Sequence, residues 1–204
     1  TSQQEAEQLA AEIRGQGVAC VLLKQDLSDI AQLPALMATA KAQLSGLCAL
    51  INNASVFERA IFTDTDEALF DRQMTVNFKV PFFLTQAFAR ELGQGCVVNI
   101  VDSDITKTHG SHFAYLLSKK ALADFTLMAA RDLGPRLRVN AVCPGHMLPS
   151  SQVELDYGER LKHMLPLKEN PSLEALCAAT RMLVEQPYLT GQLIYVDGGK
   201  SLLT

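Results

Sequence analysis

The sequence predicts a doubly wound α/β domain, in which a parallel β-sheet is covered by helices on both faces. Two observations predict this class. Short apolar runs alternate with stretches of helical periodicity along the whole chain, as strands buried between helices do. The 204 residues are 48% hydrophobic, which is enough for one sizeable core. Because no repeat, low-complexity tract or linker divides the chain, we expect a single domain over residues 1–204.

The expected helices are marked by caps and by apolar periodicity. Ser2 and Glu5 have the spacing of a capping box, and apolar residues then recur at helical intervals as far as Gly15. Pro81 lies inside a long helical region and is expected to break or bend it. The expected helical stretches are residues 2–15, 30–44, 66–92 and one that carries Tyr115 and ends near Leu133.

Short apolar runs between these stretches are expected to form the strands. The runs are VACVLL at 18–23, LCALIN at 47–52, CVVNIV at 96–101, LRVNAVCPG at 137–145 and QLIYVDGG at 192–199. A polar insertion and a further helix separate the last two runs.

The composition narrows the class of partner and the compartment. The net charge is −4 and no run of basic residues occurs, which argues against nucleic-acid binding and favours a small-molecule partner. No apolar run is long enough for a membrane span, so no membrane partner is expected. Five widely spaced cysteines favour buried thiols in a reducing compartment, so we expect a cytoplasmic protein. The four histidines do not have metal-ligand spacing, and no metal is expected.

A glycine-rich phosphate turn is missing from the sequence. Dinucleotide-binding sheets normally open with a strand, a G-x-G-x-x-G turn and a helix, and no such motif occurs in this chain. Because the sequence starts at a helix cap, we expect that it lacks the first β-α-β segment of such a domain. The alternative is a chain that has lost the usual pyrophosphate site.

Tyr115 and Lys119 form the pair with the clearest chemistry. At positions i and i+4 they project from one helical face. A nearby ammonium would lower the pKa of the phenol from about 10 and make Tyr115 a useful proton donor. Taken alone, the Y-x-x-x-K pattern is a weak signal.

Further motifs accompany this pair in a fixed order. They are INNAS at 51–55, VN ending at Asn77, NAVCPG at 140–145 and VDGG at 196–199. Together with Tyr115 and Lys119 they resemble the short-chain dehydrogenase/reductase family over essentially the whole sequence. The resemblance implies a Rossmann-type fold and a nicotinamide cofactor. It also implies that Tyr115 is the proton donor, that Lys119 holds the nicotinamide ribose, and that Asn77 fixes a relay water through a local helix distortion.

The same resemblance assigns the cofactor contacts. Asp26 would approach the adenine, with a strand-end cap as its alternative role. Asn53 and Ala54 would line the adenosine side, and the backbone after Pro144–Gly145, including Met147, would face the carboxamide.

Asp102 departs from the general pattern of the family. The family serine stands thirteen residues before the tyrosine, which is position 102 here, whereas Ser103 is one residue too late. Adjacent side chains of an extended segment point to opposite sides, so Ser103 is expected to face away from Tyr115. A carboxyl beside a tyrosine can relay a proton, which suits a substrate whose reduced bond ends in ring nitrogen.

This substitution is similar to that of pteridine reductases and of the related dihydromonapterin reductases. Phe57 matches the aromatic on which a pterin stacks, with core packing as its alternative role. Ser55 follows the N-N-A element, and its hydroxyl would reach the substrate or a cofactor phosphate. The resemblance implies NADPH as cofactor, with Ser2 near its 2'-phosphate, although Ser2 has the alternative role of an ordinary N-cap.

The predicted function is therefore NADPH-dependent reduction of a pterin, with Asp102, Tyr115 and Phe57 contacting the substrate. A carbonyl or 3-ketoacyl reductase and a non-catalytic nucleotide-binding module are the alternatives. The family resemblance also implies a homotetramer with the Tyr115 helix at an interface. The polar, proline-flanked segment 147–171 has the character of a lid over the cleft.

Overall fold

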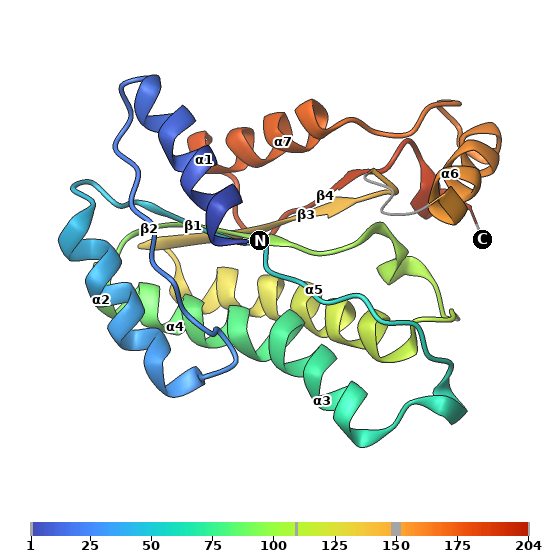
Figure 1. The fold of residues 1–204 in the computed structure, drawn as a ribbon, viewed down its shortest axis with the longest axis horizontal. Coiled ribbons are helices and arrows are strands. Elements are labelled where there is room, and N and C mark those ends of the chain that lie inside the picture. The colour runs from blue at the N-terminus through green and yellow to red at the C-terminus, as the bar shows by residue number, and fades with distance from the viewer. Residues whose placement is uncertain (1, 109, 148–151, 204) are drawn as a thin grey trace.

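A parallel four-stranded sheet forms the centre of the molecule (Figure 1). The computed structural model describes residues 2–108, 110–147 and 152–203. The strands lie in the order β1-β2-β3-β4, and every neighbouring pair is parallel. Their bounds are β1 Ala49–Asn52, β2 Gly95–Ile100, β3 Leu137–Pro144 and β4 Leu193–Val196.

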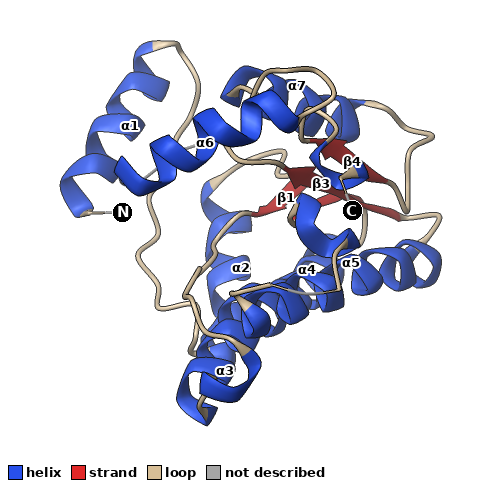
Figure 2. Ribbon diagram, turned by 90° about the vertical axis from the view of Figure 1, so that its right-hand side faces the viewer, coloured by secondary structure: helices blue, strands red, loops and turns tan. Residues whose placement is uncertain are grey.

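Helices cover both faces of this sheet, as Figures 1 and 2 show. Residues of α2, α4 and α5 pack against one face, and residues of α7 pack against the other. The predicted parallel α/β class is therefore confirmed. The helices are α1 Gln3–Gly15, α2 Leu33–Gln43, α3 Glu67–Met74, α4 Val80–Leu92, α5 Phe113–Leu133, α6 Gln152–Met164 and α7 Leu173–Glu185.

The alternation of side chains along β2 divides the core into two layers. Val97 packs with Phe88 of α4 and Leu33 of α2, whereas the next residue, Val98, packs with Leu183 of α7. All of these side chains are fully buried. Burying a side chain of this size stabilises the fold by roughly 1.5–3 kcal/mol, so both helical layers are held by the same short strand.

The apolar run at 18–23 is not a strand in the structure. It has no regular secondary structure and joins no ladder, and among the described strands β1 pairs only with β2. Val18 and Leu22 remain 56% and 44% exposed. An apolar sequence becomes a strand only where a neighbour supplies hydrogen bonds, so here the prediction from the sequence is wrong.

The long helical region at 66–92 is broken before Pro81, not by it. A π-helical turn at Thr75–Lys79 separates α3 from α4, and Pro81 lies in the first turn of α4. The N–H of Val80 still donates to the carbonyl of Thr75 across the π-turn, and Pro81, which has no N–H to donate, follows directly after this bond. The π-turn inserts one extra residue into the helix and so rotates α4 relative to α3.

Helix α6 is a further element that apolar periodicity does not predict. It lies within the polar segment 147–171, where Leu161 and Leu165 anchor its end and the following turn in the interior. Within the described ranges, the structure contains no helix with the length and apolar character of a membrane span.

Gly95 provides a test of how closely the start of β2 packs on the residue before β1. Its φ is +139°, and an added Cβ would lie 2.4 Å from the carbonyl oxygen of Cys48. We expect Gly95→Ala to lower the free energy of unfolding by about 1–3 kcal/mol, measured by urea denaturation. The control is Gly15→Ala, where an added Cβ meets nothing within 4 Å. Equal stability of the two variants would contradict this account.

Candidate active site

The candidate site lies at the carboxyl edge of the sheet. Asn53 follows β1, Asp102 follows β2, and Pro144 ends β3. Parallel pairing brings these three ends to one edge, which is where α/β sheets bind their ligands. Helix α5 then adds Tyr115 and Lys119 from its first two turns.

Asp102 and Tyr115 are joined by a hydrogen bond. The Tyr115 hydroxyl donates to Asp102 Oδ2 at 2.7 Å, and Tyr115 is only 8% exposed. Asp102 is extended, with φ −163° and ψ 147°, so the next side chain turns away. Ser103 is fully buried, and its Oγ finds no hydrogen-bond partner among the described residues. The register predicted from the sequence is confirmed, since Asp102 and not Ser103 meets the tyrosine.

The electrostatics of Tyr115 differ from the prediction. Burial and the Asp102 carboxylate both raise the pKa of the phenol. Lys119 lies 5.8 Å from the ring centroid, and its Nζ donates to the carbonyl of Ile100 at 2.8 Å. The expectation that Lys119 lowers the pKa of Tyr115 is therefore wrong for this structure, because the phenol is buried and hydrogen-bonded to a negative charge. Tyr115 is neutral at ordinary pH and holds its proton toward Asp102.

Lys119 is itself perturbed by its surroundings. Burial lowers the pKa of its ammonium to about 8, and the Asp102 carboxylate opposes that change. A lysine with this pKa is largely charged at neutral pH, and it can stabilise negative charge that develops on Tyr115 or Asp102.

Asn77 clamps the loop that follows β1. Its side chain is fully buried, and Oδ1 accepts from Val56 N at 2.9 Å and from Ser55 Oγ at 3.0 Å. Nδ2 donates to Val56 O at 2.9 Å and to Ser118 Oγ at 3.2 Å. The expected helix distortion is present as the π-turn. The side chain is occupied by these protein partners, so a relay water at this residue would have to use its backbone.

Gln73 completes this clamp and was missed by the sequence analysis. It is fully buried one helical turn before Asn77. With its amide oriented to satisfy both ends, it donates to Val56 O and accepts from Glu58 N, each at 2.9 Å. Together Gln73 and Asn77 fix the backbone on both sides of Phe57.

Phe57 lies beside the Asp102–Tyr115 pair and is not a core residue. Its ring is edge-on to Tyr115, with centroids 4.6 Å apart, and stacks on His112 at 4.0 Å. It is 55% exposed. A bridge between Ala60 and His112 ties the two loops together. This arrangement presents a flat aromatic surface next to a proton-carrying group.

The predicted adenosine contacts have local roles in the structure. Ser2 Oγ accepts from Glu5 N and Ser2 N donates to the Glu5 carboxylate, so Ser2 is the N-cap of α1. The Asp26 carboxylate accepts from the hydroxyl and the N–H of Ser28, which lowers its pKa. Among the described residues, Ser2 and Asp26 make no hydrogen bond to Asp102 or Tyr115.

The remaining predicted cofactor contacts border the same edge. Asn53, Ala54 and Ser55 are exposed, whereas Pro144, Gly145 and Met147 are partly buried. The lid segment 147–171 includes residues 148–151, which lie outside the described residues.

A buried amide network behind the site was also missed. Asn52 Nδ2 donates to Asn99 Oδ1 at 2.8 Å, and Asn99 Nδ2 donates to Thr126 Oγ1 at 2.9 Å. The available signal was an asparagine inside each of two apolar strand runs, since such a side chain needs a partner when buried.

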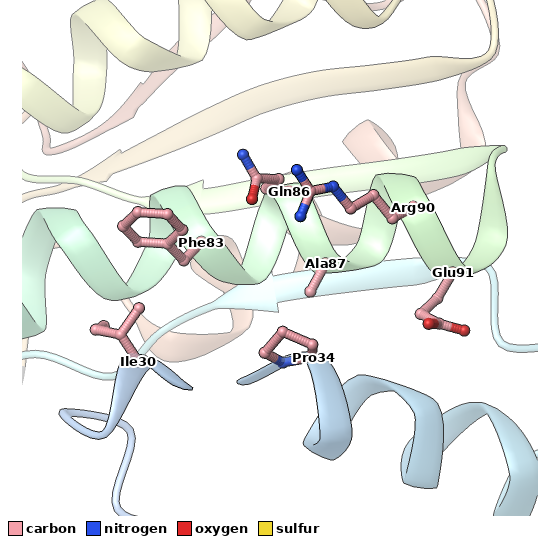
Figure 3. A pocket seen from close by; sticks show the side chains of 7 residues that line it. All are labelled: Ile30, Pro34, Phe83, Gln86, Ala87, Arg90 and Glu91. Atoms are coloured by element: carbon pink, nitrogen blue, oxygen red, sulfur yellow. The ribbon is translucent and has the colours of Figure 1, made fainter. Parts of the chain in front are cut away.

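A groove elsewhere on the molecule has no part in this chemistry. Figure 3 shows it between α4 and the start of α2, and none of the predicted site residues lines it. The residues that line the groove are Ile30, Pro34, Phe83, Gln86, Ala87, Arg90 and Glu91.

Across the described ranges, His, Cys, Asp and Glu side chains form no group of three that could hold a metal ion.

Comparisons with known proteins identify the family of this chain. The family model described as enoyl-(acyl carrier protein) reductase matches residues 1–201. The chain is 31% identical to oxidoreductase UcpA of Salmonella typhimurium, over 97% of this chain and 82% of that protein. It is 27% identical to dihydromonapterin reductase of an Enterobacter species, over 93% of this chain and 80% of that protein.

Solved structures give the same result. FolM alternative dihydrofolate reductase 1 from Brucella suis, in complex with NADP, superposes with a TM-score of 0.93 and 35% identity, over 100% of this chain and 83% of that one. Its counterpart from Brucella canis gives 0.91 and 34%, over 100% of this chain and 82% of that one. The fold and the Tyr–Lys pair define an α/β oxidoreductase. More particularly, the chain belongs to the short-chain dehydrogenase/reductase family.

The coupling between Asp102 and Lys119 can be tested by titration. The carboxylate favours the charged ammonium, so Asp102→Asn should move the pKa of Lys119 below about 8. Carbon-13 NMR of labelled lysines, with the signal assigned through Lys119→Met, measures this directly. Asp124→Asn, an exposed change on α5, is the control and should leave the pKa in place. An unchanged pKa in Asp102→Asn would refute the coupling.

Proposed function

We propose that this protein is an NADPH-dependent reductase of pterins, delivering hydride to a ring carbon of a dihydropterin or related pterin. The observation that carries the proposal is the Asp102–Tyr115 hydrogen bond next to the half-exposed ring of Phe57. It rests on the family's fold and on relatives whose names specify dihydromonapterin and dihydrofolate reduction.

The residues at the carboxyl edge of the sheet fit a dinucleotide. Lys119 offers a buried ammonium for ribose hydroxyls, Asn53 and Ala54 are exposed, and Pro144 ends β3, just before Gly145, at the same edge. NADPH, when bound, supplies the hydride. The NADP in the two FolM structures favours the phosphorylated cofactor.

Asp26 and Ser2 would hold the adenosine end of the cofactor. The Ser2 hydroxyl proton can still donate to a 2'-phosphate while its oxygen caps α1. Asp26 can accept from an adenine amino group with the lone pairs that Ser28 leaves open. Ser55, exposed at the carboxyl edge of the sheet, would contact substrate or phosphate. A phosphate contact requires its hydroxyl to turn away from Asn77 Oδ1, to which it now donates.

The chain's own residues supply the proton. The Tyr115 hydroxyl donates to the Asp102 carboxylate at 2.7 Å, so a proton delivered to a ring nitrogen of a pterin would come from Tyr115. Lys119, charged below about pH 8, would offset one of the two negative charges left on the pair until Tyr115 takes up a proton again. Phe57, held by the Gln73–Asn77 clamp, would orient the flat ring by stacking.

The first test is the substrate profile of the protein expressed from its complete reading frame. NADPH oxidation would be followed with dihydrobiopterin, dihydromonapterin, dihydrofolate and a ketoacyl thioester. Turnover of the pterins and not of the thioester is the expected result. A preference for the thioester would indicate a carbonyl reductase, and no turnover with any substrate would indicate a non-catalytic protein.

Asp102→Ser tests the role of the carboxylate. We expect kcat for the pterin to fall about 10²–10⁴-fold, the usual contribution of a positioned acid–base group, while the Kd for NADPH changes little. Asp124→Ser on the exposed side of α5 is the control. Pterin turnover equal to that of the wild type would refute the role of Asp102.

Phe57→Ala tests the stacking surface. The loss of one aromatic contact of about 0.5–1.5 kcal/mol should raise KM for the pterin about 2- to 12-fold, with little change in KM for NADPH. Tyr188→Ala, at a side chain that is 96% exposed, should change neither constant. If Phe57→Ala also changes neither, the pterin does not stack on this ring.

We also propose that the protein is a homotetramer with α5 at an interface. Leu122 and Ala129 of α5 are buried in the chain's own core and are not available to a partner. Leu117 and Met128 of the same helix are 42% and 67% exposed, and these are the side chains that a second subunit would cover. Light scattering of the intact protein measures the oligomeric state directly.

A further inference from the structure

A buried lysine outside the proposed catalytic group is tied to the turn that carries Asp102. We propose that Lys200 is a positioning residue, which holds the Asp102 turn in its reactive geometry through an ion pair with Asp104. The inference deepens the proposed function and rests on it, because it concerns how Asp102 is kept against Tyr115.

A continuous series of contacts links Lys200 to the reacting pair. Lys200 Nζ lies 2.9 Å from Asp104 Oδ1, and the backbone N–H of Asp104 donates to Asp102 Oδ1 at 2.7 Å. The other oxygen of Asp102 accepts from Tyr115 at 2.7 Å. A movement of Asp104 therefore changes the direction of the carboxylate that Tyr115 uses.

Lys200 reaches Asp104 from a segment that is distant in the sequence. Lys200 begins a 3₁₀ turn after β4, and Asp197 shapes the approach by accepting from Gly199 N at 2.9 Å and Ser201 N at 2.7 Å. Thr106, in the 3₁₀ turn that follows Asp102, donates to the carbonyl of Ser201 at 3.3 Å. Two contacts thus join the turn at 103–106 to the turn at 200–202.

The burial of Lys200 makes its partner important. Its side chain is 8% exposed, and a buried ammonium without a counter-charge is strongly unfavourable. Burial alone would lower the pKa of Lys200, but Asp104 and, at longer range, Asp102 outweigh it and raise the pKa. For Asp104, burial would raise the pKa, and the two neighbouring lysines outweigh it. The ion pair is therefore charged on both sides at neutral pH.

Lys107 offers a matched comparison. Its Nζ lies 3.1 Å from the same oxygen of Asp104. Its side chain is 27% exposed, and it belongs to the same local segment, three residues after Asp104. Lys107 can therefore neutralise Asp104, but it cannot attach the turn to another part of the chain. If charge alone mattered, the two lysines would be equivalent.

The test compares Lys200→Met with Lys107→Met in the full protein. We expect Lys200→Met to lower kcat for the reduced substrate at least tenfold while KM for NADPH changes less than twofold. Lys107→Met should lower kcat less than twofold, and Lys200→Arg should recover most of the lost activity. Thermal melting checks that each variant is folded. Equal losses from the two methionine variants, or no loss from either, would overturn the proposal.

A second measurement does not depend on which substrate is reduced. Hydrogen–deuterium exchange of the amides at 102–106 should be at least tenfold faster in Lys200→Met than in Lys107→Met. If Lys200→Met is too unstable, Asp104→Asn replaces it and should give the same increase over wild type. Unchanged exchange would overturn the proposal even if the wild type reduces pterins. Should the wild type prefer a ketoacyl thioester, the proposed function fails, and the same kcat comparison on that substrate still decides the role of Lys200.

Discussion

Parallel pairing of β2 between β1 and β3 is the constraint on which the site depends. Since all strands run the same way, the residues that follow them reach a single edge, although they are far apart in the sequence. Asp102 has its position because β2 ends just before it, and Tyr115 meets it because α5 begins at the same edge. The two hydrophobic layers that hold β2 therefore also determine where the proton-carrying group lies.

The negative charge of Asp102 is compensated by positive charges at the same edge of the sheet. Asp102 lies in the electrostatic range of two buried lysines, Lys119 from α5 and Lys200 from the turn after β4. Its own hydrogen bonds go to Tyr115 and to the backbone of Asp104. A partly buried carboxylate in such surroundings needs no direct ion pair. That arrangement explains how an acid can replace a hydroxyl here without disrupting the fold.

The sequence predicted the features that depend on local pattern. Strand and helix order, the facing of Asp102 toward Tyr115 and the distortion at Asn77 all follow from periodicity, register and resemblance. The failures depend on tertiary neighbours. VACVLL has strand composition but no partner strand. The pKa of Tyr115 is raised by burial and by a carboxylate 2.7 Å away, and the lysine one turn along the helix does not reverse this. Gln73 and Lys200 were missed because nothing in their local sequence indicates burial.

The Asn52–Asn99–Thr126 network has a consequence for how the chain selects one strand alignment. β1 has only four residues, and apolar side chains alone would tolerate a shifted pairing. A slip by one residue would turn Asn52 to the opposite side of the sheet and leave buried amides without partners. The asparagines thus penalise the competing alignments more than they strengthen the native one. The three side chains therefore select the native pairing of β1 with β2 over sheets in which the two strands are shifted.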